Sequence, residues 1–402
     1  MNRKKKSTPS SHAADDHFQK MAGWLKMESE AEAQRMRLRR ARSNSRDAEK
    51  SGESLLDLAI SDHEAGMAGR YMMTFVKRNR ELRMPWHRLR VGSPVVVSSE
   101  DEHDDSMYHG VVSQRRDDSI QVALEEWPEG HNFRIDMSPD EITRRRQMQA
   151  LNAVQNATGR LGTLRKIMMG ERDPKFQSPR KCDFFTELNE WQKEAVRFSI
   201  SCSDLSVIHG PPGTGKTTTV VELIRQIVKI EQSVLACAPS NTAADNLLER
   251  LVAGNVRVVR LGHPARVAEH LREYSLDMLV ENHDNMLIIN DMYKEAESLF
   301  RQAGRYTRAK PVRGAKQDMR REAKRLKSDA RRLERATAKH ILDGADVICA
   351  TTTLDPEILG DRFFDWAIID EACQSTEPGT WVPMMHAYRV VLAGDHCQLP
   401  PT

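Results

Sequence analysis

Apolar residues along this chain follow several spacings, and each predicts a different kind of structure. Phe18, Met21 and Leu25 repeat at helical intervals among good helix formers, so residues 16–46 are predicted to form a helix. Short β-like runs follow, separated by turn-forming or charged segments, and they predict a small β-barrel. These runs are residues 71–76, 91–97, 108–113, 120–124 and 133–135.

A second apolar stripe, from Ile142 to Met168, predicts one long helix over residues 139–169, which Gly170 ends. We expect the helices before and after the barrel to pair as a stalk. Beyond Cys182, short apolar runs alternate with helical segments, which predicts an α/β fold with a doubly wound parallel sheet. The predicted strands are residues 205–209, 234–238, 256–260, 346–350, 366–370 and 390–393.

Residues 265–345 interrupt this alternation with a charged helical insertion. Apolar positions from Ile289 to Leu299 and from Met319 to Leu333 predict two helices that form an antiparallel hairpin. Residues 301–340 hold 15 Lys/Arg against 4 Asp/Glu. Such a basic run suits either a solvated helix face or contact with a phosphate backbone, and the sequence leaves both readings open.

Composition narrows the class of protein. Hydrophobic residues make up 39% of the 402 residues and charged residues 30%, and no stretch approaches the 18 apolar residues of a membrane span. Residues 1–15 are predicted to be a disordered basic tail rather than a secretory signal. The six cysteines form no C-x-x-C pair, which argues against a zinc site from spacing and favours a reducing compartment, the cytoplasm or the nucleus.

A phosphate-binding loop follows the strand predicted at residues 205–209. Its residues are Gly210, Pro211, Pro212, Gly213, Thr214, Gly215, Lys216, Thr217 and Thr218, which fit the pattern G-x-x-x-x-G-K-[ST] between a strand and a helix. The glycines allow backbone N–H groups to approach the phosphates of ATP. Lys216 is predicted to contact the β and γ oxygens, and the Thr217 hydroxyl to ligate Mg²⁺.

The strand predicted at residues 366–370 ends in two carboxylates, Asp370 and Glu371. In a P-loop protein, the first is expected to hold Mg²⁺ and the second to position and deprotonate the attacking water. A third polar strand end carries Gln398, whose amide is predicted to sense the γ-phosphate. In a chain without the phosphate-binding loop, the acidic strand end and the strand end with Gln398 would each be interpreted as ordinary turns at the surface.

With these elements in order, the chain resembles a superfamily 1 helicase of the Upf-like group, closest to the immunoglobulin-mu-binding-protein type. The segments that carry the resemblance are LNEWQKEAV at 188–196, APSNTAADNL at 238–247, RLGHPAR at 260–266, ATTT at 350–353, DEACQ at 370–374 and GDHCQLPPT at 394–402. The resemblance implies that Gln192 reads the adenine edge. It also implies an ATP-dependent motor that moves 5′ to 3′ on single-stranded RNA or DNA.

Five residues at strand ends are candidates for strand contact, namely Pro239, Ser240, Asn241, Thr351 and Thr352. Ligands bind at the carboxyl ends of strands in open α/β sheets, and short hydroxyls and amides there can bind phosphates without selecting sequence. Each could instead be a helix cap or a turn residue. The choice between RNA and DNA is not legible in the sequence.

The expected organisation follows from these motifs. It comprises a tail at 1–15, a stalk helix at 16–50, a β-barrel at 51–138, a stalk helix at 139–180 and a RecA-like ATPase domain at 181–402. The family continues into a second RecA-like domain that these residues lack, so the chain is expected to be a fragment. An ATP-responsive nucleic-acid-binding module without helicase activity is the alternative. A P-loop kinase or an AAA-type remodeller explains the motifs poorly.

Overall fold

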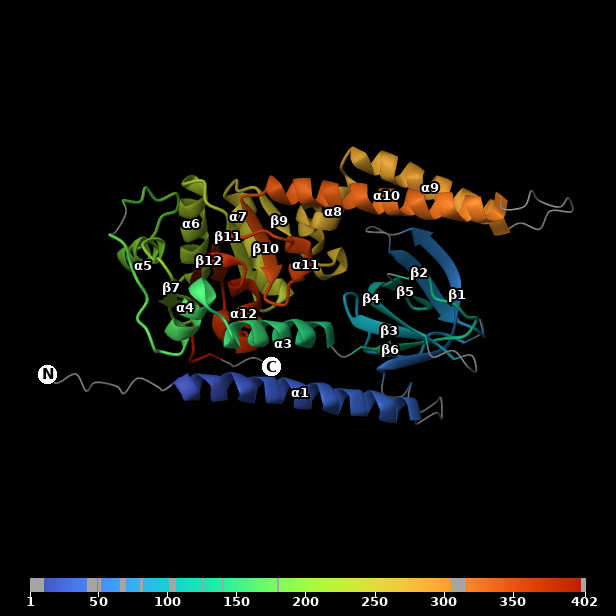
Figure 1. Cartoon of the computed structure of the whole chain (residues 1–402), viewed down its shortest axis with the longest axis horizontal. Helices are drawn as coiled ribbons and strands as arrows, with labels where there is room; N and C mark the ends of the chain where they lie inside the picture. Colours follow the sequence, from blue (N-terminus) through green and yellow to red (C-terminus); the bar gives the residue numbers. More distant parts are fainter. Residues whose placement is uncertain are drawn as a thin grey trace, which may run out of the picture.

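The structure is a computed structural model that describes residues 11–41, 49, 52–65, 70–79, 82–100, 106–124, 126–138, 141–178, 181–304 and 315–398. A closed barrel and a parallel sheet covered by helices lie side by side, and helix α1 (Ser11–Ala41) runs along both (Figure 1). The predicted disordered tail is wrong for residues 11–15, which are helical, and residues 1–10 lie outside the described residues.

The barrel has six antiparallel strands in the closed order β1-β2-β5-β4-β3-β6. They are β1 (Ser54–Ala65), β2 (Tyr71–Lys77), β3 (Pro94–Ser99), β4 (Met107–Arg115), β5 (Ser119–Leu124) and β6 (Phe133–Met137). Alternate side chains such as Val95 and Val97 point inward and are fully buried. Phe75 and Phe133 meet edge to face in this core, with ring centroids 5.6 Å apart.

Strand β1 is the one barrel strand that the apolar pattern did not predict. Its register shifts twice, between Leu55 and Leu58 and between Ile60 and Asp62, and Asp57 has a φ of 51°. Each bulge adds a residue, so the inward side chains do not alternate strictly along the sequence. A search for period-two alternation therefore misses this strand.

The sheet is wholly parallel, with the order β7-β12-β11-β8-β10-β9. Its strands are β7 (Leu205–His209), β8 (Val234–Ala238), β9 (Val258–Arg260), β10 (Val347–Thr351), β11 (Phe364–Ile369) and β12 (Ala387–Gly394). Val234 and Ala236 face one apolar cluster, whereas Leu235 and Cys237 face another. Both faces are thus covered, as a doubly wound sheet requires.

Helices α5 (Glu190–Ile200), α6 (Lys216–Lys229) and α7 (Asn241–Ala253) contribute to the cluster on one face. On the other face lie α3 (Glu141–Gln155), α4 (Gly159–Met168), α8 (Leu276–Glu281), α11 (Pro356–Leu359) and α12 (Glu377–Met384). The single helix predicted over residues 139–169 is wrong. It is two helices, because Thr158 is extended and Gly159 has a φ of 62°, outside the helical region.

Helix α1 packs on α3, and Arg144 of α3 donates a hydrogen bond to Glu32 of α1. At its other end Phe18 is buried against Trp381, and His17 bonds Glu377. The predicted pairing of these two helices is confirmed. They connect the barrel side of the molecule to the sheet (Figure 1).

The insertion contains the predicted hairpin, formed by α9 (Asn285–Gly304) and α10 (Ala315–Asp343), which pack along each other and lie over the barrel (Figure 1). The part of the insertion before the hairpin is also helical. It consists of two short 3₁₀ helices, η2 (Pro264–Arg266) and η3 (Glu269–Tyr274), and of α8. Among the described residues, no helix is long and apolar enough to cross a membrane.

Candidate nucleotide site and nucleic-acid groove

The phosphate-binding loop connects β7 to α6. Gly213 and Gly215 have φ angles of 78° and 77°, a left-handed conformation that favours glycine. A Cβ at Gly210 would lie 2.6 Å from the Thr214 Oγ1, and one at Gly215 would lie 2.6 Å from the Gln192 Nε2. A larger residue at these positions would clash with a neighbour or strain the backbone, so this conformation of the loop requires glycine there. Since Pro211 and Pro212 carry no N–H, the donors available to a phosphate begin at Gly213.

Lys216 begins α6 and is 8% exposed. Its Nζ donates hydrogen bonds of 2.7 Å to the Gly210 carbonyl and 3.3 Å to the Pro211 carbonyl. The ammonium group is thus directed back over the loop, where a phosphate oxygen is a charged alternative to these carbonyls. Thr218, also predicted here, accepts a hydrogen bond from Arg250 of α7.

Asp370 follows β11 and is 3% exposed. Burial raises the pKa of this carboxyl, opposed by hydrogen bonds from the Thr217 hydroxyl and from the Glu371 N–H, which lies 3.0 Å from Oδ1. A buried carboxylate beside a hydroxyl is a pair of hard oxygen donors, and a cation would offset the cost of burying the charge. These two residues therefore fit a magnesium ion.

Glu371 has a φ of 52° and a ψ of 37°, which is left-handed backbone at a residue other than glycine. This conformation costs about 1–2 kcal/mol, and such residues cluster at functional sites. Because the chain turns at Glu371 and the strand does not continue, the Glu371 side chain need not point away from the Asp370 side chain, as successive residues of a strand do. Gln374 donates a 3.3 Å hydrogen bond to the Glu371 carboxylate.

Gln398 lies in the turn after β12, and its Nε2 donates a 3.3 Å hydrogen bond to Asp395 Oδ2. The other oxygen of Asp395 accepts from the Cys397 N–H at 3.0 Å and from His209 Nε2 at 3.3 Å. These hydrogen bonds, chiefly the one from Cys397, lower the pKa of Asp395. Sequence reasoning missed Asp395 and His209. Their positions at adjacent strand ends were the available signal.

Gln192 lies beside the phosphate loop, as the resemblance implied, but its amide already has two partners. The oxygen accepts from the Asn189 N–H at 3.0 Å, and Nε2 donates to the Thr214 carbonyl at 3.0 Å. With the Asn189 side chain bonded to the Gln192 N–H, this is a capping box at the start of α5. The amide therefore links α5 to the loop, and adenine recognition stays a prediction.

The residues predicted to contact a strand fall into two groups. Asn241 and Thr351 line one cavity, and the Asn241 Oδ1 accepts a 3.0 Å hydrogen bond from Arg260, which leaves its NH₂ as a donor. Pro239 and Ser240 lead into α7, where the Ser240 Oγ accepts from the Ala243 N–H as an ordinary N-cap. Thr352 is not among the residues that line this cavity, and it is 3% exposed. Its Oγ1 accepts a 3.4 Å hydrogen bond from the Ser375 hydroxyl, and contact of Thr352 with a strand stays a prediction.

This cavity, which we call the groove, has a volume of about 880 Å³ and lies between α1, the barrel, α3 and the carboxyl edge of the sheet. Its basic lining residues are Lys26, Arg70, Arg144, Arg145, Arg146 and Arg266. Among the described residues of its lining, Asp355 is the acidic one. Sequence reasoning missed the three consecutive arginines of α3, whose signal was the run of charge at the start of that helix.

Comparison with known proteins identifies the family of this chain. Residues 187–402 match a family described as AAA domain, and residues 19–142 match one described as helicase SMUBP-2/HCS1, 1B domain. The chain is 34% identical to DNA-binding protein SMUBP-2 of Mus musculus over 377 residues, which cover 89% of this chain and 37% of that protein. The chain belongs to the Upf-like superfamily 1 helicases.

Two further relatives extend the comparison. An uncharacterized ATP-dependent helicase of Methanocaldococcus jannaschii is 33% identical over 351 residues, 77% of this chain and 52% of that protein. A regulator of nonsense transcripts 1 homolog of Drosophila melanogaster is 34% identical over 247 residues, 60% of this chain and 19% of that protein. The chain therefore spans about a half or less of the length of these relatives.

Proposed function

We propose that this chain is the nucleotide-binding region of an ATP-dependent helicase that acts on single-stranded nucleic acid, with a RecA-like sheet domain as the ATPase. One observation carries the proposal. Lys216, Asp370 and Gln398 lie at the same edge of the sheet, after or beside the neighbouring strands β7, β11 and β12. A basic groove opens at the next strand ends of that edge, at Asn241 and Thr351.

Each residue at the nucleotide site has a distinct role in this proposal. The N–H groups from Gly213 to Thr218 and the Lys216 ammonium bind the phosphates of ATP. Thr217 and Asp370 hold Mg²⁺, which when bound screens the charge on the β and γ oxygens. Glu371 orients the attacking water and accepts its proton. Asp395 positions the Gln398 amide, which contacts the γ-phosphate.

The groove supplies the nucleic-acid site in this proposal. Arg144 and Arg146 of the groove are paired with Glu32 and Asp355, whereas Arg145 is exposed and attracts a phosphate backbone. The Asn241 amide and Thr351 hydroxyl offer hydrogen bonds that do not select sequence. The printed name of the mouse relative states DNA binding, and the archaeal one is named an ATP-dependent helicase. We propose both properties for this chain, with movement 5′ to 3′ as the family resemblance implies.

Strand-stimulated ATP hydrolysis by the 402-residue chain tests the function. Replacing Glu371 by Gln keeps the shape but removes the base, so turnover is expected to fall by about 10²–10⁴ while nucleotide affinity is retained. Glu231→Gln is a matched control, because Glu231 also has a positive φ, of 57°, but follows the far end of α6. Turnover that persists in Glu371→Gln would contradict the assigned role.

The alternative function has a different outcome in the same assay. A nucleic-acid-binding module without motor activity would bind strands with an affinity that falls with salt and does not depend on ATP. ATP hydrolysis is measured in parallel with single-stranded RNA and with single-stranded DNA of the same length. The strand that stimulates turnover more identifies the preferred substrate.

A further inference from the structure

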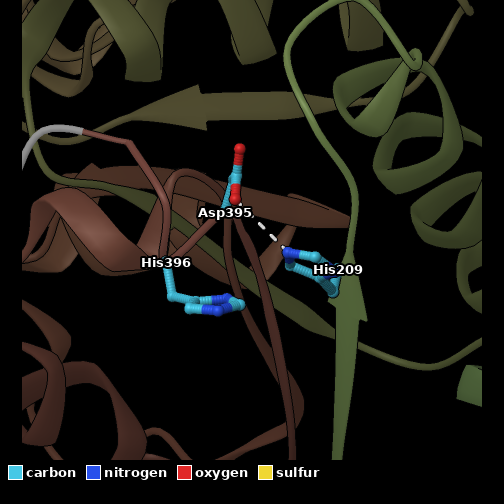
Figure 2. Close-up of side chains that lie close together, drawn as sticks. All are labelled: His209, Asp395 and His396. Atoms are coloured by element: carbon cyan, nitrogen blue, oxygen red, sulfur yellow. Dashed lines mark hydrogen bonds and ion pairs between the residues drawn. The ribbon is translucent and has the colours of Figure 1, made fainter.

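Three side chains of types that can ligate a metal ion lie close together beside the phosphate loop. His209 is the last residue of β7, and Asp395 and His396 directly follow β12, the neighbouring strand. Figure 2 shows His209 pointing toward Asp395, with the His396 ring beside them. The two imidazole centroids are 4.9 Å apart, with their planes at 41°. The nucleotide chemistry proposed above uses neither histidine.

The spacing of the ligand atoms suits a small tetrahedral cation. His209 Nε2 and Asp395 Oδ1 are 3.3 Å apart, and one ligand atom from each of the three residues lies within 4.8 Å of the others. Zinc bonds of about 2.0–2.1 Å place neighbouring tetrahedral ligands about 3.3 Å apart. The first two ligands therefore already have this separation, and the exposed His396 has a ring nitrogen within 4.8 Å of both.

The backbone holds the first two ligands in place. The Gly210 N–H donates to the Gly394 carbonyl, so the residue after His209 is bonded to the residue before Asp395. Asp395 is 4% exposed and its carboxylate is oriented by the Cys397 N–H. A carboxylate that is fixed in this way does not have to be ordered when a cation binds.

We propose that His209, Asp395 and His396 bind a divalent transition-metal ion of the zinc class, at a site separate from the Thr217–Asp370 pair. Two imidazoles and one carboxylate select Zn²⁺, Cu²⁺ or Ni²⁺ over Mg²⁺ and Ca²⁺, which prefer oxygen ligands. Three protein ligands leave a fourth position open to water or to a ligand from solution.

Binding at this site has a consequence that rests on the proposed function. The Asp395 Oδ2 accepts the hydrogen bond from the Gln398 amide, and a metal on Oδ1 draws the same carboxylate toward His209. The ion would thereby connect the strand before the phosphate loop to the residue that contacts the γ-phosphate. We expect it to inhibit ATP turnover.

The test measures Zn²⁺ binding to the 402-residue chain by calorimetry, without nucleotide and with excess Mg²⁺. His209→Ala and His396→Ala are each expected to weaken binding by at least about tenfold, the lower range for loss of even an outer-shell partner. His270→Ala is the matched control, because this histidine is 66% exposed and pairs with Glu249 away from the cluster. Absence of Zn²⁺ binding, or binding that both cluster variants retain, would overturn the proposal.

Co²⁺ absorption identifies the ligands independently. Binding through histidine and aspartate gives weak d–d bands without the intense thiolate charge-transfer band in the near ultraviolet. Cys397 is exposed and adjacent to His396, so Cys397→Ser is expected to leave the spectrum unchanged. Loss of the spectrum in this variant would assign the metal to the thiol and contradict the three-residue site.

The two proposals fail separately. Metal binding is measured without ATP, so a chain that binds Zn²⁺ at the cluster but does not bind ATP refutes the helicase function and leaves the metal site intact. A chain that hydrolyses ATP but does not bind Zn²⁺ does the reverse. Inhibition of turnover by Zn²⁺ that disappears in His396→Ala supports the connection between the two sites.

Discussion

The ammonium nitrogen of Lys216 lies 2.7 Å from the carbonyl oxygen of Gly210, the residue that begins the same loop. The ammonium group is hydrogen-bonded to neutral carbonyl groups at a position that is 8% exposed, and the Asp370 carboxyl is near enough to interact with its charge. A phosphate oxygen carries full negative charge and makes a stronger hydrogen bond to the same group. Exchange of the carbonyl for a phosphate should thus favour nucleotide binding.

Replacement of Lys216 by Ala should weaken nucleotide binding. A hydrogen bond to a charged group contributes about 1.5–3 kcal/mol, so the dissociation constant for ATP is expected to rise by about 10- to 150-fold. Isothermal titration calorimetry measures this change. Lys229→Ala is the control, since Lys229 lies at the opposite end of α6 and pairs with Asp183. Equal affinities in the unchanged chain and in Lys216→Ala would contradict the role of the loop.

Replacement of Arg145 by Ala should reduce the salt dependence of single-strand binding. Arg145 is an exposed residue of the groove lining, and loss of one phosphate contact lowers the slope of log K against log salt by about 0.7. Fluorescence anisotropy over a series of salt concentrations gives the slope. Arg332, which is 82% exposed on α10 and outside the groove lining, is the control. An equal effect of Arg332→Ala would favour the hairpin as the binding surface.

The sequence predicted the parts of the molecule whose structure follows from a short, continuous stretch of residues. The strands β7 and β8 have the predicted bounds, and the loop from Gly210 to Thr218 joins a strand to a helix as its pattern requires. In a parallel sheet that is buried on both faces, each strand is a nearly continuous apolar run. Such runs are legible without knowledge of the neighbours.

The features that the sequence did not predict depend on contacts between distant segments. Strand β1 has bulges that remove its alternation, and the break between α3 and α4 lies at the extended residue Thr158 and at Gly159, which has a positive φ. Asp395 gains its role from His209, which is 186 positions away in the sequence. Thr352 and Thr351 are adjacent, yet one is buried and the other lines the groove. Packing against other segments sets the direction of a side chain at a strand end, and a short sequence motif carries no information about that packing.

Replacement of Asp245 by Ala should strongly destabilise the sheet domain. Asp245 accepts a 3.0 Å hydrogen bond from Arg260, whose side chain is fully buried, and a second bond from the Ala268 N–H. Removal of Asp245 leaves the buried Arg260 charge without its counter-ion, and breaking a buried pair in this way costs about 3–5 kcal/mol of unfolding free energy. Urea unfolding followed by tryptophan fluorescence reports this change, since Trp366 and Trp381 are buried in this domain.

The control for this variant is an ion pair of similar geometry at the surface. Arg257 and Asp346 are bonded at 2.5 Å, but the Arg257 side chain is 74% exposed. Arg257→Ala should therefore lower the unfolding free energy by no more than about 1 kcal/mol. If the two variants lost equal stability, burial would not be the cause of the effect at Asp245.

His263 should make the stability of this region decrease in acid. Burial, together with the charges of Arg70 and Arg266, lowers the pKa of His263 to about 4. In the unfolded chain the same imidazole has a pKa of about 6.5, so between these values the unfolded state binds the additional proton. The contribution of neutral His263 is therefore complete above about pH 6.5 and is lost as the pH falls toward 4, by about 3 kcal/mol.

The variant His263→Asn tests this prediction, because asparagine does not titrate and can still accept the hydrogen bond that the Ala265 N–H donates to His263 Nδ1. Urea unfolding of the variant should show a smaller loss of stability than the unchanged chain between about pH 6.5 and pH 4. His270→Asn, at an exposed position, should follow the unchanged chain. Arg266 also donates a 2.8 Å hydrogen bond to the Gly92 carbonyl on the barrel side. A protonated His263 would therefore place a second positive charge beside this contact between the barrel and the sheet domain. Identical pH profiles for His263→Asn and the unchanged chain would show that this imidazole is not held neutral in the folded state.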